Sequence, residues 1–147
     1  MKETPIEKIY EAWTAVVDGR VSLEEGADEQ AGAAVVRSSD GKKSYRVTWR
    51  DNGKVFTSTD PATYWQGYAG YPVIAVLMTL GRLPIGDEAS RYSGVNWTEL
   101  NARYKRDYAA ALATLQKERG IDAAASAREA EACHTALRNL TLTLKRK

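Results

Sequence analysis

Two hairpin signals, Asp40-Gly41 and Asn52-Gly53, stand twelve residues apart, each between runs of strand-forming residues. Asp-Gly and Asn-Gly favour two-residue type I′ turns, because both central residues take a positive φ and the twist of the turn matches that of the strands. Two such turns set the register of three successive strands. The sequence therefore predicts a three-stranded antiparallel meander around these turns.

The predicted register separates the meander into an apolar face and a polar face. The first turn places Val36 opposite Tyr45, and the second places Trp49 opposite Phe56. Directly opposed residues share a face, and successive residues alternate between faces. The apolar face collects Val36, Tyr45, Val47, Trp49 and Phe56. The polar face collects Arg37, Arg46, Thr48, Arg50, Thr57 and Thr59, with Val35 and Val55 as apolar exceptions.

Helical patterns surround the meander. Thr4, Pro5 and Glu7 are typical of a capping box at the start of a first helix, which Gly19 ends. Residues 72–80 are apolar on every side, which predicts a buried central helix. Between the first helix and the meander, Val21 and Leu23 are compatible with a short strand.

The C-terminal third predicts two further helices. Asn96 is a capping residue, and Leu and Tyr side chains follow it at helical spacing until Gly120. A last helix begins near Asp122 or Ser126 and carries an apolar stripe as far as Leu144. The short link between the two helices predicts an antiparallel helical hairpin.

These elements define an α+β fold class: an N-terminal helix, a three-stranded antiparallel β-meander, a buried central helix and a C-terminal antiparallel helical hairpin. A length of 147 residues suits one hydrophobic core. We therefore expect residues 1–147 to form a single globular domain.

Charge and cysteine content narrow the function classes. The net charge of +2 is mild and does not indicate a dedicated nucleic-acid or membrane-surface binder. It is unevenly spread, because residues 1–29 carry eight acidic and three basic side chains, whereas the meander and residues 145–147 are basic. The lone Cys133 has no disulfide partner, and no apolar run suggests a signal peptide or a membrane span. We expect a cytoplasmic protein without a membrane partner.

The chain offers little for metal or nucleophilic chemistry, so we expect no metal and no cofactor. One histidine and one cysteine cannot build the usual four-ligand zinc site, which leaves a carboxylate-based metal site as the alternative. Cys133 and His134 are adjacent on a helix, so their side chains diverge by roughly 100° and do not easily form a nucleophile–base pair. The segment 67–70 has the GXXG spacing of a KH loop but no basic residue within it, and we interpret its glycines as turn residues before the buried helix.

Two groups of residues are candidates for binding. The first is the basic sheet face, where nucleic acid or another anion would meet Arg37, Arg46, Thr48 and Arg50. Its alternative is a merely solvated sheet face. The second is a cluster of large aromatics that would line an interface or groove, or else wrap the buried helix as core: Tyr64, Trp65, Tyr68 and Tyr71.

These candidates suggest three functions, which are given in the order in which the sequence favours them. The first is a non-catalytic binding or protein-interaction module of unknown partner, with self-association as one form of it. The second is a nucleic-acid-binding protein that uses the basic sheet face and the basic C-terminal tail. The third is a small enzyme using carboxylates and tyrosines such as Asp60, Tyr64, Asp87 or Glu88, for which the sequence supplies no constellation, so the chain is not expected to be an enzyme.

Overall fold

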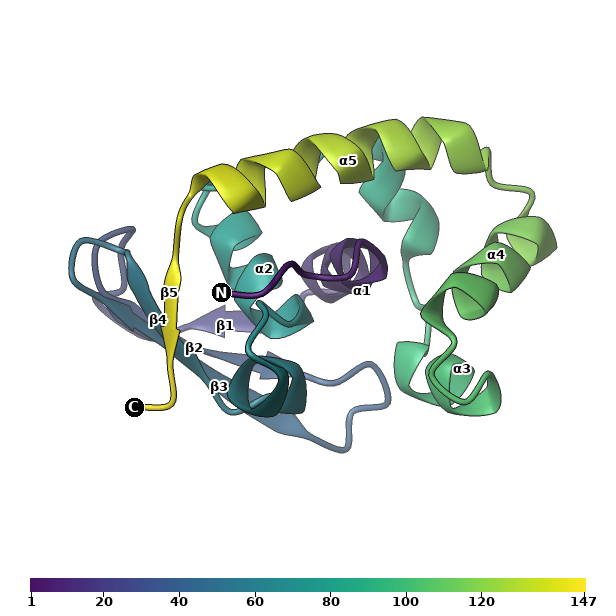
Figure 1. Ribbon diagram of the computed structural model, residues 1–147. Coiled ribbons are helices and arrows are strands. Elements are labelled where there is room, and N and C mark those ends of the chain that lie inside the picture. The colour runs from purple at the N-terminus through teal and green to yellow at the C-terminus, as the bar shows by residue number, and fades with distance from the viewer.

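A five-stranded sheet with helices packed on one side forms the frame of the protein (Figure 1). The computed structural model describes residues 1–147. The strands lie in chain order across the sheet: β1 (Val21–Leu23), β2 (Gly32–Arg37), β3 (Ser44–Arg50), β4 (Val55–Ser58) and β5 (Thr143–Lys145). The seven helical segments are α1 (Glu7–Val17), the π-helical turn η1 (Ala62–Gln66), α2 (Tyr71–Thr79), the 3₁₀ helix η2 (Asp87–Tyr92), α3 (Trp97–Arg103), α4 (Tyr108–Arg119) and α5 (Ala123–Asn139). The fold is mixed α+β, as predicted.

Strands β2, β3 and β4 form the predicted meander in the predicted register. Val36 pairs with Tyr45 and Trp49 pairs with Phe56. At the second turn, both residues of Asn52-Gly53 take a positive φ, as a type I′ turn requires. The apolar face is buried under α2 through Val36, Val47, Trp49 and Phe56.

The first turn differs from the prediction. Only Gly41 takes a positive φ there, and the Ser38 N–H donates to the Lys43 carbonyl over 2.8 Å, so a four-residue loop replaces the type I′ turn. The carboxylate of Asp40 accepts from the Ser38 hydroxyl, which favours this wider loop. The observed four-residue loop has the same centre as the predicted two-residue turn, so the strand register is unchanged.

Two short strands extend the meander on either side. Strand β1 lies where Val21 and Leu23 suggested it, whereas β5 was not predicted, because the last helix ends at Asn139 instead of continuing to Leu144. Thr143 donates its N–H to Lys54 and starts a parallel pairing with β4. The leucines at 137, 140 and 144 follow helical spacing, which suggested a longer helix. The leucines at 140, 142 and 144 are two residues apart, which fits a strand equally well.

The expected helical hairpin is wrong in two respects. The predicted helix between Asn96 and Gly120 is broken, because Lys105 and Arg106 both take a positive φ and Asp107 caps a new helix by accepting from the Ala110 N–H. The resulting α4 also does not lie alongside α5. Figure 1 shows the two helices meeting at a corner, with α5 running across the top of the molecule.

The expected capping box of α1 is absent. No side chain caps this helix, and the Thr4 hydroxyl donates instead to the Ala69 carbonyl over 3.0 Å. This bond ties the N-terminus to the loop before α2. The buried central helix is confirmed, since every residue of α2 from Pro72 to Met78 is buried.

Candidate ligand-binding pocket

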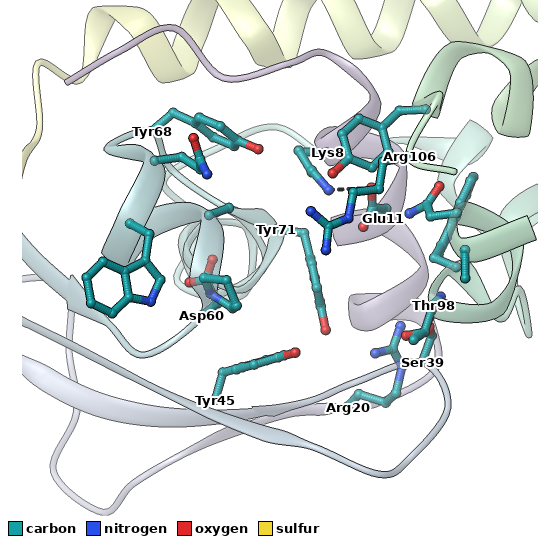
Figure 2. A pocket seen from close by; sticks show the side chains of 18 residues that line it. Lys8, Glu11, Arg20, Ser39, Tyr45, Asp60, Tyr68, Tyr71, Thr98 and Arg106 are labelled. Atoms are coloured by element: carbon teal, nitrogen blue, oxygen red, sulfur yellow. Dashed lines mark hydrogen bonds and ion pairs between the residues drawn. The ribbon is translucent and has the colours of Figure 1, made fainter. Parts of the chain in front are cut away.

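A pocket of about 600 Å³ opens between the start of α1, strand β3, the η1–α2 segment and the α3–α4 junction (Figure 2). Each of these segments brings at least one polar or aromatic side chain to it. Helix α1 contributes Lys8 and Glu11, which lie three residues apart on one side of the helix. The break between α3 and α4 brings Arg106 and Tyr108 to the pocket, with Tyr108 beside Lys8.

A buried ion pair forms one end of the pocket. Lys8 and Glu11 are 7% and 5% exposed, and Lys8 Nζ lies 3.1 Å from Glu11 Oε2 and 3.9 Å from the centre of the Tyr108 ring. Burial disfavours the charged ammonium and by itself lowers the pKa of Lys8. The attraction of Glu11 and Tyr108 together outweighs this effect, so the pKa of Lys8 is raised overall. Burial raises the pKa of Glu11, against the opposing effect of Lys8. Lys8 is therefore a protonated group whose charge is balanced by Glu11, and it is not a free nucleophile.

Four tyrosines surround the cavity, and the guanidinium of Arg20 interacts with the hydroxyl of one of them, Tyr71. Tyr45, Tyr68, Tyr71 and Tyr108 line the pocket, whereas Tyr92 is the tyrosine whose hydroxyl forms hydrogen bonds of normal geometry within the protein. The rings of Tyr45 and Tyr71 meet edge to face with centroids 6.3 Å apart. Burial raises the pKa of the Tyr45, Tyr68 and Tyr71 hydroxyls, so they are protonated donors at neutral pH.

Arg20 lies at the floor of the pocket and is 8% exposed. One terminal nitrogen, Nη1, donates to the Arg37 carbonyl, while the other, Nη2, is buried and has no hydrogen-bond partner. Arg20 and Arg106 take part in none of the ion pairs of the protein. Figure 2 shows the Arg20 guanidinium and the Tyr45 and Tyr71 hydroxyls in the same lower part of the pocket.

Asp60 lines the pocket but is already engaged in local structure. Its carboxylate accepts from the Ser58 hydroxyl and from the Thr63 N–H, which starts η1. Gly70 approaches so closely that a Cβ there would lie 2.1 Å from Asp60 Oδ2. Gly67 turns the chain with a φ of 79°, so both glycines serve the turn that precedes α2. Single π-helical turns such as η1 are frequent at functional sites.

The structure places the predicted aromatic cluster on two sides of η1. Trp65, Tyr68 and Tyr71 line the pocket, while Tyr64 lies on the other side, where its carbonyl accepts from Arg146 Nε over 3.0 Å. Trp65 is 66% exposed and lies between the pocket and the C-terminal tail. The guanidinium of Arg146 stands over both rings, 5.3 Å from Tyr64 and 5.2 Å from Trp65.

The basic sheet face lies apart from the pocket. Arg46 forms an ion pair with Glu24, which follows β1, and Arg50 contacts Asp51 at 3.7 Å and donates to the Lys147 carbonyl. The Thr48 hydroxyl pairs with that of Thr57 across the strands, and Arg37 is exposed. The acidic N-terminal part therefore meets this face at one ion pair, through Arg46.

The residues named for an enzyme are not brought together. Asp60 is in the pocket and Tyr64 outside it, while Glu88 in η2 is bound to Arg91 at 2.8 Å and to the Ser126 hydroxyl. His134 Nε2 lies 2.7 Å from the Thr4 carbonyl. No group of three or more His, Cys, Asp or Glu side chains is arranged to hold a metal ion. None of the helices has both the length and the apolar character needed to cross a membrane.

Sequence reasoning missed the charged residues of the pocket. Lys8 and Glu11 lie on the face of α1 that is opposite its apolar stripe. Charged residues on such a face suggest only that it is exposed to solvent. Their burial depends on the α3–α4 junction, and the position of Arg106 depends on the helix break there. The one available signal was the Lys-Arg-Asp run at 105–107, in which an aspartate can cap a new helix.

Fold and site together define a mixed α+β protein with one tyrosine-lined, cation-bearing pocket beside its sheet. The chain belongs to the family described as uncharacterised conserved protein UCP014422, whose model matches residues 1–143. No curated protein and no solved structure matches the chain.

Proposed function

We propose that this protein is a non-catalytic binding module whose pocket takes a small ligand with a planar ring. One observation carries the proposal: four tyrosine rings line the cavity, and their hydroxyls face it with no side-chain partner in the protein apart from the Arg20 guanidinium beside Tyr71. Ligand pockets combine an aromatic lining with a few convergent polar groups, and 600 Å³ lies within their usual range of roughly 300–1,000 Å³.

A binding role fits the pocket better than catalysis. Glu11 is paired with Lys8, and the Asp60 carboxylate accepts from Ser58 and Thr63, so both acids of the pocket are already engaged within the protein. The cavity lining contains no His or Cys. The pocket therefore holds neither a thiol nucleophile nor a histidine base to activate a hydroxyl.

Saturation-transfer NMR with benzyl alcohol, benzoate and phenyl phosphate tests the proposal. Tyr68→Ala removes a ring from the pocket wall, and Tyr64→Ala removes one from the same segment outside the pocket. We expect signals with the wild type and Tyr64→Ala and their loss with Tyr68→Ala, provided that thermal unfolding shows both variants folded. Absence of signal for every compound with the wild type would overturn the proposal.

A second candidate is nucleic-acid binding through Arg37, Arg46, Thr48, Arg50 and the C-terminal tail. One observation favours it: the tail joins Arg50 to the exposed Trp65, because Arg50 donates to Lys147 and Arg146 stands over the indole. Exposed aromatics beside arginines are typical of single-strand binding. Oligonucleotide affinity that falls steeply between about 50 and 200 mM salt, and is lost in Arg146→Glu, would support this candidate.

A further inference from the structure

Arg20 holds a fixed position at the floor of the pocket. Its backbone N–H donates to Ala15 and its carbonyl accepts from the Arg37 N–H, so the residue is bound between the end of α1 and strand β2. Its side chain adds the Nη1 bond to the Arg37 carbonyl. The guanidinium is therefore positioned before any ligand arrives.

The second terminal nitrogen of Arg20 lacks an acceptor. Nη2 is buried without a partner in a side chain that is 8% exposed. Buried guanidinium groups are almost always paired, because a donor removed from water without a new acceptor costs free energy. Neither carboxylate of the pocket pairs with it, since Glu11 is bound by Lys8 and Asp60 by Ser58 and Thr63. The Tyr71 hydroxyl, with which the Arg20 guanidinium interacts, is a neutral group and leaves the charge uncompensated.

Two further donors lie beside Arg20. Arg20 lowers the pKa of the Tyr71 hydroxyl through its charge and a side-chain hydrogen bond, against the larger effect of burial, and this hydroxyl can still donate its own proton to a ligand. The Tyr45 ring meets that of Tyr71. Figure 2 shows both hydroxyls in the part of the pocket that Arg20 occupies. A guanidinium and two phenolic hydroxyls form a donor set that matches the oxygens of a carboxylate or a phosphate.

We propose that Arg20, Tyr45 and Tyr71 form a subsite for the oxyanion of the ring-bearing ligand, a carboxylate or a phosphate. The inference rests on the proposed function, since it names the charged end of the ligand that the pocket takes. The unpaired guanidinium of Arg106, which Figure 2 shows reaching over the pocket from the opposite wall, adds positive charge at the mouth.

Calorimetric titration with three matched compounds tests the subsite. Benzyl alcohol is neutral, benzoate carries a carboxylate and phenyl phosphate a phosphate on the same ring. We expect the wild type to bind one of the two anions at least about tenfold more tightly than benzyl alcohol, since a charge-assisted hydrogen bond changes affinity by that order. The tighter anion identifies the oxyanion.

Variants locate the subsite within the pocket. The double variant Tyr45→Phe/Tyr71→Phe keeps both rings, removes two donors and should abolish most of the anion preference, and Arg20→Gln should do the same. Tyr108→Phe is the matched control, because it removes a hydroxyl at the Lys8 end of the same pocket. Arg106→Gln should weaken anion binding by a smaller factor, with Lys105→Gln, the neighbouring residue outside the pocket, as its control.

The outcomes separate the subsite from the pocket. Equal affinity of the wild type for all three compounds would overturn the oxyanion subsite and leave the proposed binding function intact. Binding of none of them would overturn both. An anion preference that survives in Tyr45→Phe/Tyr71→Phe would place the anion elsewhere and overturn the assignment, even if Arg20→Gln fails to fold.

Discussion

Two aromatic groups lie on opposite faces of α1 and use their polar atoms differently. In the core, the rings of Tyr10, Trp13 and Tyr92 pack with centroids 4.8–5.5 Å apart. The Tyr92 hydroxyl donates to Ser126 and accepts from Gln116. In the pocket, the hydroxyls of Tyr45, Tyr68 and Tyr108 have no such partners, and that of Tyr71 interacts with the Arg20 guanidinium. Aromatic content alone therefore does not distinguish packing from recognition, whereas the use of the polar atoms does.

The core cluster is not completely satisfied. The indole N–H of Trp13 is buried without a partner, as is Arg20 Nη2. Trp13 belongs to the central cluster of buried side chains, while Arg20 borders a cavity large enough for a ligand. The unpaired donor is a cost of packing in the first case and a binding group in the second.

The largest expected effect separates a core tryptophan from an exposed one. Trp13→Ala should lower the free energy of unfolding by about 3–5 kcal/mol, because Trp13 is 1% exposed and its removal leaves a cavity. Trp65→Ala should lower it by at most about 1 kcal/mol, because the ring is 66% exposed and contributes only its contacts with Tyr64 and Arg146. Urea unfolding followed by circular dichroism measures both. Similar losses in the two variants would contradict the distinction between core and pocket rim.

A smaller effect separates the hydroxyls. Tyr92→Phe should lower the free energy of unfolding by about 1–3 kcal/mol, since it leaves the buried Gln116 amide without its acceptor. Tyr71→Phe should change it by no more than about 0.5 kcal/mol, because the guanidinium beside its hydroxyl, that of Arg20, keeps its bond to the Arg37 carbonyl. The same unfolding experiment compares the pair. A loss in Tyr71→Phe equal to that in Tyr92→Phe would show that the pocket hydroxyl is structural.

Local signals predicted the meander and the buried helix well. The register depended on the positions of two turn centres, and it survived the wrong turn type at Asp40 because a wider loop kept the same centre. Helix α2 was recognisable because residues 72–80 are apolar all round. These features depend on short stretches of sequence.

The pocket depended on long-range structure and could be predicted only in part. Tyr68 and Tyr71 were named from their density in the sequence, but Arg20 and Lys8 gave no local signal, because each is buried by segments distant in the chain. The helix break at Lys105 and Arg106 was missed because the stripe of leucines and tyrosines continues through it at helical spacing. Tertiary contacts outweigh helix propensity at such positions.

The smallest effect concerns alkaline pH. Burial raises the pKa of Tyr10 in the core and of Tyr71 in the pocket, so both phenols stay protonated in the folded chain above about pH 10, where the unfolded chain ionises them. The folded chain then binds more protons than the unfolded chain, and its stability falls as the pH rises through this range. Tyr10→Phe and Tyr71→Phe should each reduce the slope of the free energy of unfolding against pH by an amount equivalent to up to one bound proton. Neither variant should change this slope below about pH 9. Urea unfolding at pH values between about 8 and 11 measures the slopes. If only Tyr10→Phe flattens the curve, bulk water reaches the Tyr71 hydroxyl, and the pocket is more open than its burial indicates.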